Sequence, residues 1–99
     1  MLVLPRPNVI SCNLSEGAAL LDVESGTYYS VNSIGHAVWN FISTSPCSFE
    51  QVVDFLFSEF DEDRQVIEDD LKELFDCFEK NNLIVVQRNR DNAKSKNAY

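Results

Sequence analysis

The side chains that could support catalysis are few and form no recognisable set. His36 is the only histidine, and no serine or cysteine lies at a spacing that would pair it with a nucleophile. We expect His36 to be a partly exposed helix residue. The three glycines, Gly17, Gly26 and Gly35, are isolated, so the chain has no phosphate-binding glycine loop. The sequence therefore predicts a protein that is not an enzyme.

Acidic runs and cysteines could instead suggest a metal site. Asp61-Glu62-Asp63 and Glu68-Asp69-Asp70 lack the alternating oxygen ligands and central glycine of a calcium loop, so solvated helix starts and faces explain them better. Cys12, Cys47 and Cys77 are odd in number and widely spaced, without a C-x-x-C pair. We expect buried free thiols, and we predict neither a metal nor a cofactor.

Size and charge limit the class of protein. The 99 residues are 44% hydrophobic, which fits one small domain, and we place it at residues 1–87. That part carries fifteen acidic and four basic residues, whereas 88–99 is polar and basic and is expected to be a disordered tail. Such an acidic domain repels phosphate backbones, so nucleic acid is not an expected partner. Without a signal peptide or a membrane-spanning run, we expect a cytoplasmic protein.

Three strands are expected first. In Asn8 to Leu14, the residues Ile10, Cys12 and Leu14 alternate with polar residues, as in a half-buried strand. Ala18 to Val23 and Thr27 to Val31 follow, and Gly26 between them can adopt the positive φ of a tight turn. The short connections predict an antiparallel meander with two free edges.

Three helices are expected next. Asn32 or Ser33 can cap the first, and Ser48 with Gln51 forms a capping box for the second. Asn81-Asn82 ends the third, and 83–86 is expected to dock on the core as an extended segment. The apolar positions expected to face the core are Ile34, Ala37, Val38, Phe41 and Ile42 in the first helix, Phe49, Val52, Val53, Leu56, Phe57 and Phe60 in the second, and Ile67, Leu71, Leu74, Phe75 and Phe78 in the third. The fold class is α+β, with the helices packed on one face of a small sheet.

The segment LLDVESGTYYSVNSIGHAVWNFI resembles the PqqD family, in which a Gly-x-Tyr-Tyr-x-Leu-Asn-like motif precedes a glycine and an aliphatic-Trp pair. A second similar segment is SFEQVVDFLFSEFD, and the resemblance covers roughly 9–85. Val31 replaces the usual Leu and Asn82 the usual Gly, and both substitutions keep the chemistry of the position.

The resemblance implies a winged helix-turn-helix-like fold that recognises the leader segment of ribosomally made, modified peptides. It implies that the leader adds as a strand to the edge of the third strand, in a groove walled by the third helix. Tyr29 and Val31 should then face the core or groove, with Tyr28 and Ser30 more exposed. The expected peptide-binding residues are Thr27, Tyr28, Tyr29, Ser30 and Val31 on the strand, and Glu68, Leu71, Lys72, Phe75 and Asp76 on the helix. Acidic residues near the groove predict basic residues in the leader.

Several functions stay open at this point. We favour a lasso-peptide pathway, with a precursor peptide and a separate leader peptidase or other maturation enzyme as partners. The alternatives are a chaperone that presents a precursor to a radical SAM enzyme, an adaptor that binds only the enzyme, and a DNA-binding winged-helix protein. The acidic third helix disfavours DNA. The free strand edge allows either a monomer or an edge-paired dimer.

Overall fold

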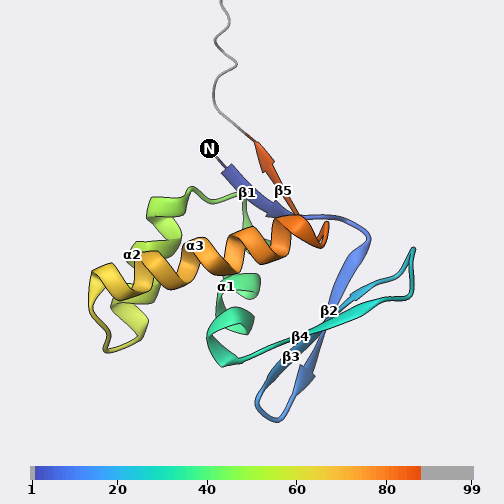
Figure 1. Ribbon diagram of the computed structural model, residues 1–99, viewed down its shortest axis with the longest axis horizontal. Helices are drawn as coiled ribbons and strands as arrows, with labels where there is room; N and C mark the ends of the chain where they lie inside the picture. Colours follow the sequence, from blue (N-terminus) through green and yellow to red (C-terminus); the bar gives the residue numbers. More distant parts are fainter. Residues whose placement is uncertain (1, 88–99) are drawn as a thin grey trace, which may run out of the picture.

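The computed structural model describes residues 2–87, and the predicted tail, 88–99, lies outside the described residues. Three helices pack beside a three-stranded sheet, with a second, two-stranded sheet at the end of the last helix (Figure 1). The elements are β1 Leu2–Pro5, β2 Val9–Leu14, β3 Gly17–Asp22, β4 Tyr28–Val31, α1 Ser33–Thr44, α2 Phe49–Glu59, α3 Arg64–Lys80 and β5 Ile84–Gln87. The α+β class and the succession of a meander and three helices are confirmed.

The larger sheet has the order β2-β3-β4, and both neighbouring pairs are antiparallel. The Asp22 carboxylate holds the β3–β4 turn, because it accepts hydrogen bonds from the Asn8 side chain at 2.9 Å and from the Glu24 N–H at 3.0 Å. These bonds, the one from Asn8 first, lower the pKa of the Asp22 carboxyl. Gly26 has the positive φ that the sequence predicted, 77°. In the strand order β2-β3-β4, β4 is an edge strand.

The second sheet pairs the two ends of the described chain. β1 runs antiparallel to β5, with Val3 opposite Val86. Val3 also exchanges two backbone hydrogen bonds with Cys47, at 2.7 and 3.1 Å, which tie β1 to the loop between α1 and α2. The expected extended segment at 83–86 is thus confirmed as a strand, whereas β1 was not predicted.

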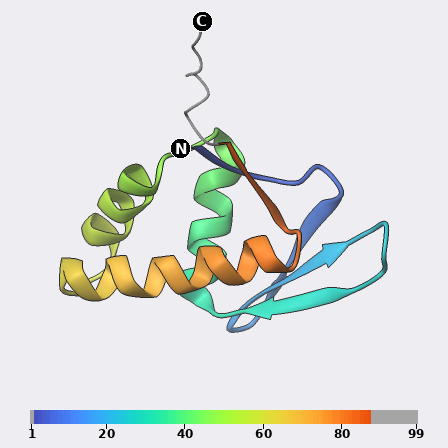
Figure 2. The same ribbon diagram turned by 45° about the horizontal axis from the view of Figure 1, so that its top comes forward.

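On β2, the face that is buried is the opposite of the one that the sequence predicted. Val9 on β2 and Leu20 on β3 are buried, while Ile10 and Leu14 are 49% and 53% exposed. The register places Ile10 opposite Leu21, and both side chains lie on the outer face of the sheet. The expectation was wrong because the larger sheet lies to one side of the three helices (Figure 2), and none of the elements within residues 2–87 covers its outer face at Ile10 and Leu14.

The core lies between the sheets and the helices, with Trp39 packed edge-on against Phe78 at 5.7 Å between ring centroids. Two expected core residues are exposed instead, Ile34 at the start of α1 and Phe57 on α2. Phe55 packs in place of Phe57 and stacks on Phe41 at 4.2 Å. The apolar stripe of α2 is broad, so the sequence does not show which of its aromatic residues is buried. That depends on how the neighbouring helix packs against α2.

The predicted caps of α1 and α2 are present, and one of the three cysteines is buried. Asn32 caps α1, and the capping box of Ser48 and Gln51 is present at α2. All three cysteines are free, but only Cys47 is buried; Cys12 and Cys77 are exposed. The expectation of three buried thiols was wrong because Cys12 lies on the uncovered face of β2 and Cys77 on an open side of α3.

Candidate functional site

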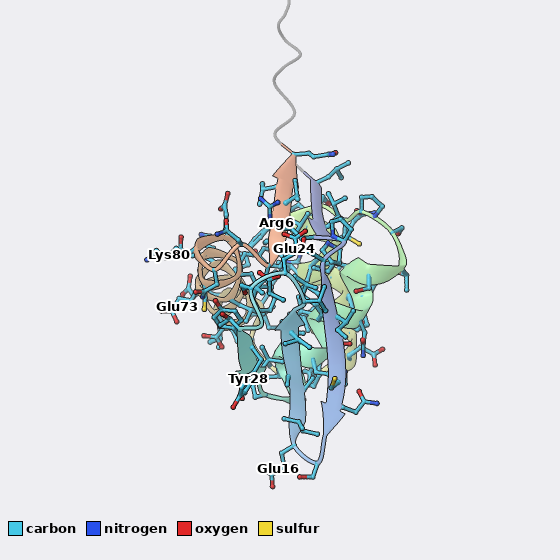
Figure 3. All side chains as sticks on the ribbon, turned by 90° about the vertical axis from the view of Figure 1, so that its right-hand side faces the viewer. Arg6, Glu16, Glu24, Tyr28, Glu73 and Lys80 are labelled. Carbon is cyan, nitrogen blue, oxygen red and sulfur yellow. The ribbon has the colours of Figure 1, made fainter. Side chains whose placement is uncertain are left out.

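A cleft lies between the edge strand β4 and the second half of α3. Its volume is about 490 Å³. Figure 3 shows Tyr28 on β4 at the margin of the sheet, below the helix that carries Glu73 and Lys80. The lining residues are Tyr28, Tyr29, Ser30, Val31 and Asn32 on the strand side, Leu74, Cys77, Phe78 and Asn81 on the helix side, and Leu83. None of these side chains carries a formal charge, so the cleft suits an uncharged or apolar segment.

The backbone of β4 can accept a further strand. The Thr27 carbonyl accepts a hydrogen bond from the Asp22 N–H at 2.9 Å, which fixes the phase of the ladder between β3 and β4. Because the backbone groups of successive strand residues alternate in direction, those of Tyr29 and Val31 face β3 and those of Tyr28 and Ser30 face the free edge. Tyr28 and Ser30 thus offer N–H and C=O groups along the cleft.

The side chains of β4 follow the predicted alternation. Tyr29 and Val31 are partly buried and pack against the core, whereas Tyr28 and Ser30 are exposed. Thr27 precedes the strand, and its N–H donates to the Ser25 hydroxyl at 3.2 Å. Four of the five expected strand residues therefore line the cleft, and Thr27 belongs to the turn.

The helix residues named from the sequence are placed differently. Phe75 is buried against Phe49 of α2, at 6.2 Å between ring centroids. Glu68 pairs with Arg64, and Asp76 pairs with Lys80 at 3.5 Å. Phe75, Glu68, Asp76 and the exposed Lys72 therefore do not line the cleft. Leu71 lines a second, adjoining cavity.

The helical period explains why the α3 residues that line the cleft differ from the expected ones. The buried stripe of α3 has two flanks, one near Glu68 and Asp76 and the other near Leu74 and Cys77. The sequence cannot tell which flank faces β4, because that depends on how the helix lies on the sheet. The spacing of Leu74, Cys77, Phe78 and Asn81 was the available signal, since these positions form one helical row.

A second cavity, of about 500 Å³, adjoins the cleft at the first half of α3. Asn32 and Leu74 line both hollows, so the two adjoin at the point where β4 meets α1. Its lining residues are Asn32, Ile34, Gly35, Leu56, Phe60, Asp61, Glu62, Ile67, Asp70, Leu71, Glu73 and Leu74. An apolar floor with carboxylates around it distinguishes this cavity from the uncharged cleft.

Residues 2–87 hold neither a metal-binding cluster nor a membrane-spanning helix. Within residues 2–87, no cluster of three or more histidine, cysteine, aspartate or glutamate side chains is arranged to hold a metal ion. None of the described helices is long and apolar enough to cross a membrane.

Two solved structures share this fold. One is TbiB1 in complex with the TbiA(beta) leader peptide, with a TM-score of 0.76 and 22% identity over 87% of this chain and 99% of that chain. The other is lasso peptide synthetase B1 complexed with the leader peptide, with a TM-score of 0.73 and 25% identity over 85% of this chain and 98% of that chain. No curated protein sequence matches this chain.

A family model also matches the sequence. The model for coenzyme PQQ synthesis protein D, PqqD, covers residues 17–84, which include β3, β4, the three helices and the beginning of β5. Both sides of the cleft, the edge strand and α3, lie inside the matched region. This chain belongs to the PqqD family.

Proposed function

We propose that this protein binds the leader segment of a ribosomally made precursor peptide by strand addition to β4, without catalysing a reaction itself. The observation that carries the proposal is the direction of the Tyr28 and Ser30 backbone groups, toward a free edge that borders a cleft. Main-chain hydrogen bonds would supply affinity, and alternate peptide side chains would enter the cleft and supply specificity. The similar structures are complexes with leader peptides, which supports a leader peptide as the ligand.

We assign the binding surface from the cleft. It comprises Tyr28 to Val31 on the strand and Leu74, Cys77, Phe78 and Asn81 on α3, with Leu71 beneath the adjoining cavity. Contributions of Thr27, Glu68, Lys72, Phe75 and Asp76 to peptide binding stay predictions from the sequence.

The pathway is part of the proposal. A similar structure is a lasso peptide synthetase B1, and this supports a lasso-peptide pathway. We propose that in such a pathway the protein delivers the bound precursor to a leader peptidase or other maturation enzyme. We place the protein in the cytoplasm, where ribosomes make such precursors. The exposed carboxylates of Asp69, Asp70 and Glu73 on α3 speak against DNA as the partner.

The family description favours a second candidate, presentation of a precursor to a radical SAM enzyme in cofactor synthesis. The two candidates differ in the peptide that binds. A direct comparison of a lasso leader with a glutamate–tyrosine precursor, each titrated into the same protein, separates them. Tighter binding of the second peptide would assign this chain to cofactor synthesis.

Amide hydrogen exchange by NMR tests the binding mode. Saturating leader peptide should slow exchange of the Tyr28 and Ser30 amides by at least about tenfold, because the added strand gives them acceptors. The Tyr29 and Val31 amides face β3 already, so they serve as internal controls with little change. Binding without protection at Tyr28 and Ser30 would contradict strand addition at this edge.

A pair of variants at one position supports the same test. Ser30→Pro removes an outward-facing N–H and places a ring at the edge, while the ladder with β3 keeps its bonds. We expect it to weaken leader binding by about tenfold or more, since one hydrogen bond is lost and the approach is blocked. Ser30→Ala keeps the N–H and should bind like the wild type. Circular dichroism of both variants checks that the fold is retained.

A further inference from the structure

The cavity at the first half of α3 adjoins the cleft but differs from it in charge. Asp61 and Glu62 follow α2, and Asp70 and Glu73 lie on α3; all four line the cavity. No lysine, arginine or histidine among residues 2–87 lines it. A peptide segment leaving the cleft past Asn32 would therefore enter a region of negative potential.

These four carboxylates also differ from others nearby in having no cationic partner. Asp54 and Glu68 pair with Arg64, and Asp76 pairs with Lys80. Within the described part of the chain, none of the four carboxylates at the cavity forms an ion pair. Carboxylates gathered without a counter-charge favour a cationic ligand.

The floor of the cavity is apolar and partly open. Ile34, in the first turn of α1, is 43% exposed although the sequence pattern placed it on the core face of the helix. Phe60 and Leu74, which are partly buried, and Leu71, which is buried, also line the cavity. Exposed apolar surface next to a binding cleft is typical of a place that a ligand covers.

We infer that this cavity binds a lysine or arginine of the leader, together with an apolar neighbour, from the segment that extends past the Asn32 end of β4. The aliphatic stem of the basic side chain would lie over Ile34 and Leu74, with its charged head among Asp70, Glu73 and the carboxylates that follow α2. The inference rests on the proposed function and specifies the peptide: an uncharged stretch opposite β4, then a basic residue beyond it.

A double-mutant cycle tests the pairing. The probe is a synthetic leader segment of the precursor peptide encoded in the same gene cluster, and affinity is measured by fluorescence anisotropy. The protein variant is Asp70→Asn with Glu73→Gln, and each basic residue of the peptide is changed in turn to Gln. For one basic residue of the peptide, we expect the protein variant alone and the peptide change alone each to weaken binding about tenfold. The two together should weaken it by much less than the product of the two separate losses, because both remove the same contact.

A matched control removes the same charge elsewhere. Glu16 lies in the β2–β3 turn and Glu50 in the first turn of α2, and neither lines the cleft or the cavity. Glu16→Gln with Glu50→Gln should leave affinity within about twofold of the wild type at moderate salt, because distant surface charges are screened.

The outcomes separate the two proposals. Strand addition with no coupling to any basic residue, or equal losses in the two protein variants, would overturn the cavity assignment and leave the proposed function standing. A leader that binds but contains no lysine or arginine would do the same. Failure of the wild-type protein to bind the leader at all would overturn both.

Discussion

Asn32 Oδ1 accepts a hydrogen bond from the Gly35 N–H at 2.9 Å, and this bond closes the junction between β4 and α1. Asn32 is one of two residues that line both the cleft and the acidic cavity. The position of Gly35 is constrained as well, because a Cβ there would lie 3.0 Å from Val31 Cβ. The helix cap thus fixes the end of the edge strand.

Asn32→Ala should lower the free energy of unfolding by about 1 kcal/mol, since the first turn of α1 loses its side-chain acceptor. Asn32→Asp retains an acceptor at that position and should recover most of the loss. Urea denaturation followed by circular dichroism measures both variants. Equal stability of wild type and Asn32→Ala would show that the cap contributes nothing.

Gly17 at the start of β3 lies against the backbone at the end of β4. Its φ is 132°, and a Cβ on it would lie 2.0 Å from the Val31 carbonyl oxygen. Gly17→Ala should therefore cost roughly 3 kcal/mol through strain and displacement of β4. Gly26→Ala is the control, because Gly26 has a φ of 77° but nothing within 4 Å of a Cβ. We expect a loss of only about 1 kcal/mol there, and thermal unfolding of the two variants should separate them.

Local chemistry made part of this fold predictable. Side-chain oxygen at Asn32 and the Ser48–Gln51 pair signal helix starts, because they satisfy donors within three residues of themselves. Gly26 and Asn82, the latter with a φ of 59°, mark backbone conformations that depend on their own residue type. Sequence could locate these features since both partners lie close together in the chain.

Long-range placement was not predictable in the same way. β1 consists of the short run Leu2–Pro5, and its partner β5 begins 79 residues after Pro5. Alternation in β2 defines two faces but not the one that the helices cover, so the sequence wrongly predicts Ile10 and Leu14 in the core. The stripe on α3 likewise left two flanks equivalent, and packing on the sheet turned Leu74 and Cys77 toward β4.

The apolar residues on the uncovered face of β2 should contribute little to stability. Ile10→Thr with Leu14→Thr should change the free energy of unfolding by no more than about 0.5 kcal/mol per residue, because both side chains are about half exposed. Leu20→Ala on the buried face of β3 is the comparison and should cost about 3 kcal/mol. Chemical denaturation measures the free energy of unfolding of both variants. A loss in the double variant as large as that of Leu20→Ala would place this face inside the core.

The three thiols should react at different rates. Burial raises the pKa of the Cys47 thiol, and its Sγ lies 3.1 Å from the Ser45 carbonyl oxygen, so it should react slowly with a disulfide reagent. Exposed Cys12 and Cys77 should react fast. Leader peptide should slow Cys77, which lines the cleft, and leave Cys12 unchanged. Mass spectrometry of the labelled protein assigns each site, and in denaturant all three should react alike.

β1 offers the sharpest contrast between neighbouring residues. Val3 is fully buried, pairs with Val86 and bonds to the backbone of Cys47, whereas Leu2 is 39% exposed. Val3→Ala removes two buried methyl groups and should lower the free energy of unfolding by about 2 kcal/mol. Leu2→Ala removes more carbon but should cost less than about 1 kcal/mol, because its side chain is already partly exposed to water in the folded protein. Urea denaturation of both variants measures the difference. A larger loss for Leu2→Ala would mean that β1 pairs with β5 in the opposite phase, with Leu2 rather than Val3 facing α1.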